Sequence, residues 1–394
     1  MNKKTLPIIF AFLCMGFGDV VGPLVGLAKD TFDLSYFLAM TLTFSGFIMF
    51  GLLSVPTGII QAKKGKKKIL MTGLFIAFLG LLIPIFSGMY GVAPDIEQSK
   101  DSMFYILLFA ILLLGTGATL LQVAGNPIMR DVSKDGDYAS NLSLGQAIKA
   151  IGSSLGFLVP PAVAIWFGMD WSILFPVFAA LILFTMIWLQ FTPIKEEKVD
   201  TSNIVSLSSC LKLLKNSYVL MMVIGIFIYV GAEVTMSSQV PILMKDLFGY
   251  SQYALWISWS LFFLPIFLGR LFGSFILKKL DPSLFLKLTV LLAILGLVFL
   301  ISGIQILAFI GIICIGLGFA NIFPLIFSIT IDKFPERSNE LSGLMVTAIV
   351  GGAFIPAITG YVADVAGLII SFVVPFACLV YLLYVAFSAK KSFK

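Results

Sequence analysis

The sequence predicts an all-α membrane protein, and two observations indicate this class. Only 12% of its 394 residues are charged and 59% are hydrophobic, whereas about a quarter of the residues of a soluble domain are charged. The hydrophobic residues also fall in long runs such as 69–87 and 103–121, each close to the ~20 residues that a helix needs to cross the hydrocarbon core. A membrane β-barrel would instead show alternating segments of ~10 residues, which are not seen.

Twelve transmembrane helices can be placed along the chain. Their predicted spans are 7–28, 35–61, 68–90, 103–128, 140–167, 171–192, 217–243, 252–277, 284–303, 305–330, 339–363 and 367–388. A polar stretch divides the spans six and six. We therefore expect an N-terminal six-helix bundle over 1–192, a cytoplasmic linker over 193–216 and a C-terminal six-helix bundle over 217–394.

The positively charged residues predict the orientation of these spans. Of the 26 Lys and Arg residues, 21 lie in or beside the loops on the side of the N-terminus, and only Lys29, Lys100 and Lys245 lie on the opposite side. Loops rich in Lys and Arg stay in the cytoplasm. We therefore expect both termini in the cytoplasm, and membrane lipid as the partner of these basic residues rather than nucleic acid.

The two halves share an ordered series of motifs. The matched pairs are Gly115–Gly117 with Gly316–Gly318, Asn126 with Asn321, Gly156–Pro160 with Gly352–Pro356, and Asp19–Val20 with Glu233–Val234. Gly and Pro recur in membrane helices, so one matched pair can arise by chance. The whole series, offset by about half of the chain, predicts two pseudo-symmetric six-helix bundles arranged as parallel repeats.

Four ionisable residues lie well inside the predicted spans: Asp19, Lys149, Glu233 and Arg270. Charged Asp, Lys or Arg at a helix centre costs about 2.5–3.5 kcal/mol even on mild scales, so such residues normally face an aqueous cavity or a partner. Asp19 lies in a glycine-rich stretch ending at Pro23, which lets the helix break or pack closely. We expect Asp19 to take part in cation coupling; the alternative is a permanent ion pair with Lys149.

Polar side chains in spans four and five share helix faces. Gln122 and Asn126 are four residues apart, and Gln146, Lys149 and Ser153 follow the i, i+3, i+7 pattern of one face. Amide and charged groups form bidentate hydrogen bonds with hydroxyl-rich ligands. We therefore expect the amides and Lys149 to contact such a ligand, and the alternative is hydrogen bonding between neighbouring helices.

The second half carries three further candidates. We expect Glu233 in span seven to contact the ligand or the cation, the alternative being a partner within the bundle. Asn321 is a ligand candidate by its place in the repeat. Arg270 lies about two turns before Lys278, near the end of span eight, which favours a role in gating.

Several segments resemble a known family. They are Gly18–Pro23, Pro56–Gly65, Gln122–Pro127, Asn141–Gln146, Tyr229–Val234, Gly269–Gly273 and Ala348–Pro356. Together they extend over nearly the whole chain, which is similar to members of the fucose–proton symporter family of the major facilitators. The loop motif after span two has Ala62 where major facilitators usually have an acidic residue.

This resemblance implies the major facilitator fold and the import of a hexose-type sugar with a coupling cation by alternating access. Asp19 matches the proton-carrying acid of the family. Gln122 stands where the family has a second essential glutamate, and Lys149 where it has asparagine. Proton coupling is favoured and sodium coupling stays open. The alternative substrate is an acidic sugar or another organic anion recognised by Lys149.

Other classes of function are disfavoured by what the sequence lacks. It has no His, no paired-Cys metal motif and no phosphate-binding loop, so we expect neither an enzyme nor a cofactor or metal site. The linker and tails are too short for the signalling domain of a sensor, and the amide-rich spans disfavour a drug exporter. We expect a monomer in the inner (plasma) membrane.

Overall fold

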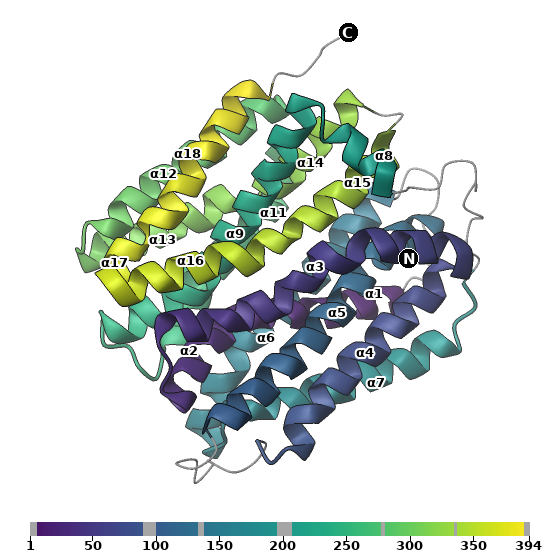
Figure 1. The fold of residues 1–394 in the computed structure, drawn as a ribbon. Coiled ribbons are helices and arrows are strands. Elements are labelled where there is room, and N and C mark those ends of the chain that lie inside the picture. Colours follow the sequence, from purple (N-terminus) through teal and green to yellow (C-terminus); the bar gives the residue numbers. More distant parts are fainter. Residues whose placement is uncertain are drawn as a thin grey trace. The chain divides into compact units, whose positions relative to one another are not determined.

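The computed structural model describes residues 6–89, 100–132, 138–194, 207–276, 280–334 and 337–389. Regular structure within these ranges is helical, and twelve helices there are long and apolar enough to cross a membrane (Figure 1). They cover Leu6–Phe32, Tyr36–Gln61, Lys66–Phe86, Ser102–Gly125, Ile148–Phe167, Trp171–Gln190, Ser217–Asp246, Ala254–Gly273, Pro282–Ile301, Gln305–Ile331, Gly343–Ala366 and Leu368–Ser388. The predicted class and the twelve spans are confirmed.

The chain divides into two compact units. Unit 1 comprises Met1–Phe32 and Ser45–Ser206, and unit 2 comprises Asp33–Phe44 and Leu207–Lys394. The first turns of helix α3 (Tyr36–Lys64) therefore group with unit 2. The predicted limits of the two bundles and of the linker stay a prediction.

In unit 1, span one is interrupted in its middle. Its elements are α1 (Leu6–Met15), the 3₁₀ turn η1 (Gly16–Val20) and α2 (Val21–Phe32). The other elements are α4 (Lys66–Phe86), α5 (Lys100–Val132), α6 (Tyr138–Phe167), the 3₁₀ turn η3 (Trp171–Ile173) and α7 (Leu174–Gln190). The interruption falls in the glycine-rich stretch and contains Asp19.

In unit 2, spans eight, ten, eleven and twelve are interrupted. The elements are α8 (Leu207–Leu213), α9 (Ser217–Asp246), α10 (Ala254–Ser258), the π-helical turn η5 (Trp259–Phe263), α11 (Leu264–Ile276), α12 (Pro282–Ile301), α13 (Gln305–Phe319), α14 (Ile322–Lys333), α15 (Ser338–Thr347), the 3₁₀ turn η7 (Ala348–Val350), α16 (Gly351–Ala366), α17 (Leu368–Ser371) and α18 (Val373–Ser388). Span ten breaks between α13 and α14, at Ala320 and Asn321.

Each unit contains one pair of helices in especially extensive contact, α4 with α5 and α12 with α13. Glycines make this possible. A Cβ atom on Gly73 would lie 2.9 Å from the Gly117 carbonyl oxygen, and one on Gly296 would lie 2.5 Å from the Gly311 carbonyl oxygen. Small residues of this kind let the backbones of membrane helices approach closely.

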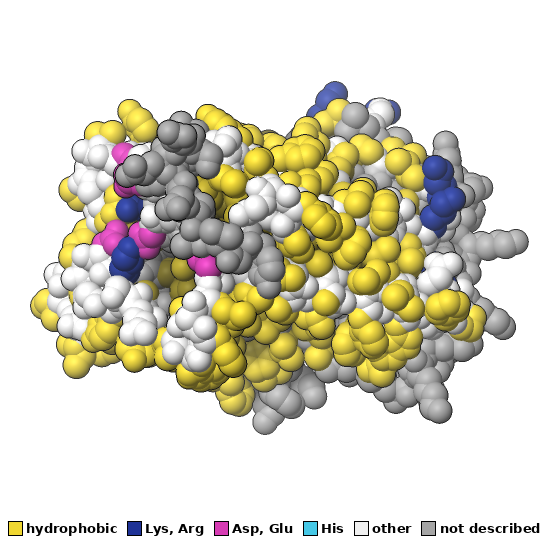
Figure 2. All heavy atoms as spheres, turned by 90° about the horizontal axis from the view of Figure 1, so that it is seen from below, with side chains coloured by type: hydrophobic (Ala, Val, Ile, Leu, Met, Phe, Trp, Pro, Cys, Tyr) yellow, Lys and Arg dark blue, Asp and Glu magenta, His cyan; other side chains and the backbone are white. Residues whose placement is uncertain are grey.

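The surface and the helix ends suit a bilayer. On the face shown in Figure 2, hydrophobic side chains cover most of the described surface and charged side chains are few. Exposed apolar side chains include Phe86 and Phe191, each more than 80% exposed, as expected where lipid is the solvent. At the end of α7, Lys67 Nζ donates to the carbonyl oxygens of Gln190 and Thr192 at 3.2 and 2.8 Å, which satisfies carbonyls that a helix leaves unbonded at its C-terminus.

Candidate functional site

The 3₁₀ turn η1 places Asp19 against α6. A Cβ atom on Gly16 would collide with the Lys149 carbonyl oxygen and would lie 2.8 Å from the Ser153 nitrogen. Only a glycine therefore allows the backbone of η1 to approach α6 so closely. This approach brings the Asp19 side chain within reach of the polar face of α6 that contains Lys149 and Ser153.

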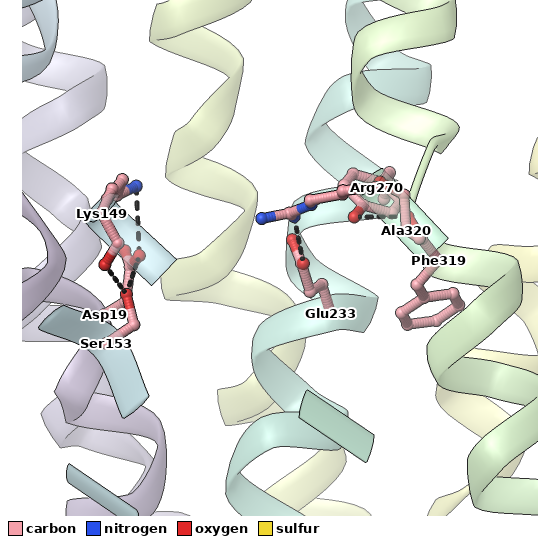
Figure 3. A network of polar contacts seen from close by, with 8 residues as sticks. Asp19, Lys149, Ser153, Glu233, Arg270, Phe319 and Ala320 are labelled. Atoms are coloured by element: carbon pink, nitrogen blue, oxygen red, sulfur yellow. Dashed lines mark hydrogen bonds and ion pairs between the residues drawn. The ribbon is translucent and has the colours of Figure 1, made fainter. Parts of the chain in front are cut away.

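Two groups of α6 hold the Asp19 carboxylate (Figure 3). Its Oδ2 lies 3.1 Å from Lys149 Nζ and accepts a 2.9 Å hydrogen bond from Ser153 Oγ. The Asp19 side chain is 34% exposed and the Lys149 side chain 20% exposed. The two charges are thus paired, and both side chains stay partly exposed. A cation or hydroxyl that binds one member can compete with the other.

A second ion pair lies in unit 2. Arg270 Nη2 on α11 lies 3.0 Å from Glu233 Oε1 on α9, and Arg270 Nε donates to the Ala320 carbonyl oxygen at 3.2 Å (Figure 3). The side chains of Arg270 and Glu233 are 37% and 23% exposed. Arg270 therefore links a carboxylate of span seven to the interruption of span ten. Its predicted role in gating stays a prediction.

Tyr229 is a member of this network that was not among the candidate residues predicted from the sequence. It is fully buried, and its hydroxyl donates to the Phe319 carbonyl oxygen at 2.9 Å. Tyr229 also interacts electrostatically with both Glu233 and Arg270. The spacing in the sequence could have indicated this contact, because Tyr229 precedes Glu233 by four residues and therefore lies on the same face of α9.

Asn321, a candidate ligand contact, lies at the interruption of span ten and is 5% exposed. Its Nδ2 donates to the Gly269 carbonyl oxygen of α11 at 2.8 Å. A Cβ atom on Gly273 would collide with the Asn321 amide, so α11 approaches this residue through glycine. Ligand contact by Asn321 stays a prediction.

The remaining candidates lie on α5 and α6. Gln122 is buried on α5, with 8% of its surface exposed. The side chains of Asn126 and Gln146 lie outside the described residues. Among the residues that the structure describes, no group of three or more His, Cys, Asp or Glu could hold a metal ion.

Comparisons with known proteins agree with the fold. A family model for the Major Facilitator Superfamily matches residues 8–357. The chain is 26% identical over 374 residues to a protein of Brucella abortus named glucose/galactose transporter, covering 92% of this chain and 88% of that protein. The similarity therefore extends over most of the length of both proteins.

Two crystal structures share this fold. The Escherichia coli fucose:proton symporter superposes with a TM-score of 0.69 at 18% identity, covering 99% of this chain and 100% of that one. A D-xylose-proton symporter superposes with a TM-score of 0.75 at 16% identity, covering 98% and 95%. With twelve helices among its described residues that are long and apolar enough to cross a membrane, and a family match over most of its length, the chain belongs to the Major Facilitator Superfamily.

Proposed function

We propose that the protein is a secondary active transporter that imports a hexose-type sugar together with a coupling cation, by alternating access. The name of the Brucella relative supports a hexose as substrate. The two superposed structures are named as proton symporters of sugars, which supports a proton as the coupling cation.

The observation that carries the proposal is the contact of Asp19 with Lys149 and Ser153 in the interrupted turn of span one. Ionisable residues within membrane helices are costly and mark ion or substrate pathways. A carboxylate that can be protonated while its lysine partner keeps its charge provides a two-state element. Asp19 is the proposed carrier of the coupling cation, with Lys149 and Glu233 as further coupling residues.

The proposed sugar contacts are the amides and charged groups inside the spans. They are Gln122, Asn126, Gln146, Lys149, Glu233 and Asn321. A neutral sugar suits this set better than an acidic one. The Lys149 ammonium already lies beside the Asp19 carboxylate, so a substrate carboxylate would have to displace that partner.

The proposed setting is the inner (plasma) membrane with both termini in the cytoplasm, and the proposed transport unit is a monomer. The orientation follows from the excess of Lys and Arg in the loops on the side of the N-terminus. Labelling of single cysteines introduced near each terminus, in intact cells, tests it.

The decisive experiment is uptake into proteoliposomes. Labelled glucose, galactose, fucose and glucuronate are offered under an inward proton gradient, an inward sodium gradient or neither. We expect a neutral hexose to accumulate above its external concentration only under the proton gradient, and a protonophore to abolish the accumulation.

Two results would overturn parts of this proposal. Accumulation of glucuronate alone would replace the neutral hexose by an acidic sugar. Accumulation under the sodium gradient alone would keep the sugar but replace the coupling ion. Absence of transport for every sugar under both gradients would sink the proposed function as a whole.

A further inference from the structure

The interruption of span ten leaves carbonyl groups that the helix itself cannot bond. Helix α13 ends at Phe319 and α14 begins at Ile322, with Asn321 at φ −117° and ψ 0° between them. In a continuous helix, the Ala320 carbonyl would accept from residue 324, but that residue is Pro324, which has no N–H. Inside a membrane such a carbonyl requires another donor.

Side chains from two other spans supply the donors. Arg270 Nε bonds the Ala320 carbonyl oxygen, and the Tyr229 hydroxyl bonds the Phe319 carbonyl oxygen. A cation suits this place electrostatically, because the carbonyl groups at the end of α13 carry partial negative charge.

The contact between α11 and the interruption is reciprocal. Arg270 on α11 donates to the backbone at Ala320, and Asn321 donates back to the α11 backbone at Gly269. Two hydrogen bonds in opposite directions therefore join adjacent residues of α11 to adjacent residues of the interruption. A small movement of the Arg270 side chain would disturb this pairing.

Glu233 holds the outer end of the same guanidinium group at 3.0 Å. The planar guanidinium donates from Nε and Nη2 in fixed relative directions. The position of the Glu233 carboxylate therefore constrains the direction in which Nε points. Figure 3 shows Arg270 between Glu233 and the backbone at Ala320.

We propose that Arg270 is a positioning residue that holds the interruption of span ten in its present geometry only while Glu233 holds Arg270. A sugar hydroxyl that donates to the Glu233 carboxylate competes with Arg270 and loosens the junction between α13 and α14. Ligand contact in span seven is thereby transmitted to the half-helix α14. The competition by a sugar hydroxyl rests on the proposed function. The link from Glu233 through Arg270 to the interruption of span ten is independent of it.

The first test is backbone hydrogen exchange of the purified protein without any ligand, read on a peptide covering residues 319–329. The variant Arg270→Lys keeps the positive charge but replaces the planar guanidinium group, which donates from two nitrogens here, by a single ammonium group. We expect exchange of this peptide to rise about tenfold, as for loss of an interhelical hydrogen bond, with α12 unchanged. The matched control is Arg337→Lys, which makes the same change in the exposed Arg337–Glu340 pair.

Glu233→Gln provides an independent variant, because Arg270 and its backbone acceptor, the Ala320 carbonyl oxygen, stay in place. We expect the same rise in exchange at 319–329. Wild-type exchange in both variants, or an equal rise in Arg337→Lys, would overturn the positioning role. These outcomes do not depend on whether the protein transports hexoses.

The second test separates positioning from sugar binding. In counterflow with the transported hexose, Arg270→Lys should lower the maximal rate about tenfold while the half-saturating concentration changes far less. The reverse pattern, weaker half-saturation with an unchanged maximal rate, would make Arg270 a sugar contact and overturn the inference.

Discussion

The Asp364 carboxylate caps the first turn of helix α3 through Tyr36. Asp364 Oδ1 accepts a 2.7 Å hydrogen bond from the Tyr36 backbone nitrogen, and Oδ2 accepts a 2.8 Å bond from the Phe37 nitrogen. In addition, the Tyr36 hydroxyl donates to Asp246 Oδ2 at 3.0 Å. The first N–H groups of a helix have no acceptor within the helix, so a carboxylate from α16, 328 residues later, completes this end.

The first prediction concerns this cap. Asp364→Ala removes both acceptors, and loss of an N-cap costs about 1 kcal/mol. Hydrogen exchange over residues 36–44 should therefore become severalfold faster, with a smaller effect for Asp364→Asn, which keeps one acceptor oxygen. Asp281→Ala is the control, because Asp281 Oδ1 also accepts from two backbone N–H groups at the start of a helix, those of Ser283 and Leu284 in α12. Faster exchange over 36–44 in the control as well would contradict the assignment.

The second prediction concerns Asp19. Asp19→Asn removes the group that can carry a proton but keeps its size and its ability to accept from Ser153. We expect uphill accumulation to be lost while counterflow, which needs no coupling, is retained. Asp30→Asn makes the same change in the last turns of span one, away from the interrupted turn, and should accumulate sugar normally. Unimpaired uphill uptake by Asp19→Asn would exclude the coupling role.

The third prediction uses the Asp19–Lys149 pair. Lys149→Gln leaves a partly buried carboxylate without its cation, and because both groups are partly exposed we expect a loss of about 1–2 kcal/mol. The melting temperature in detergent should fall for Lys149→Gln and recover in the double variant Asp19→Asn/Lys149→Gln. A double variant as unstable as the single one would mean that Lys149 acts on stability by another route.

The fourth prediction concerns the close contact of α12 with α13. A Cβ atom on Gly296 would lie 2.5 Å from the Gly311 carbonyl oxygen, so Gly296→Ala forces the helices apart and should cost about 1–3 kcal/mol. Gly58→Ala adds the same methyl group where no atom lies within 4 Å. Thermal unfolding in detergent should therefore distinguish the two variants. Equal melting temperatures for Gly296→Ala and Gly58→Ala would show that α12 and α13 can move apart at little cost in stability.

The sequence predicted the fold in outline because a bilayer imposes strong constraints. Hydropathy alone located the twelve spans, and the glycines near Asp19 indicated a local break. The pairing of Asp19 with Lys149 was considered beforehand as one of two interpretations. These features depend on local composition and on helical periodicity, both of which can be read from one chain.

Contacts that depend on the rotation of helices were not predictable. The pairing of Glu233 with Arg270 requires knowing which faces of α9 and α11 meet. The closeness of Arg270 to Lys278 favoured the helix end instead. Asp364 and Tyr36 are separated by most of the chain, and neither belongs to a motif that would have singled it out.

The two hydrogen bonds of Lys67 have a consequence for biogenesis. Their acceptors at Gln190 and Thr192 follow Lys67 by 123 and 125 residues. During synthesis these two hydrogen bonds therefore cannot form until α7 has been made. The contact between the start of α4 and the end of α7 forms only when span six arrives, so folding of unit 1 includes a late step that joins its third span to its sixth. In ribosome-stalled chains, the Lys67 amine should react faster with amine-reactive reagents before α7 has been made than after extension past Thr192.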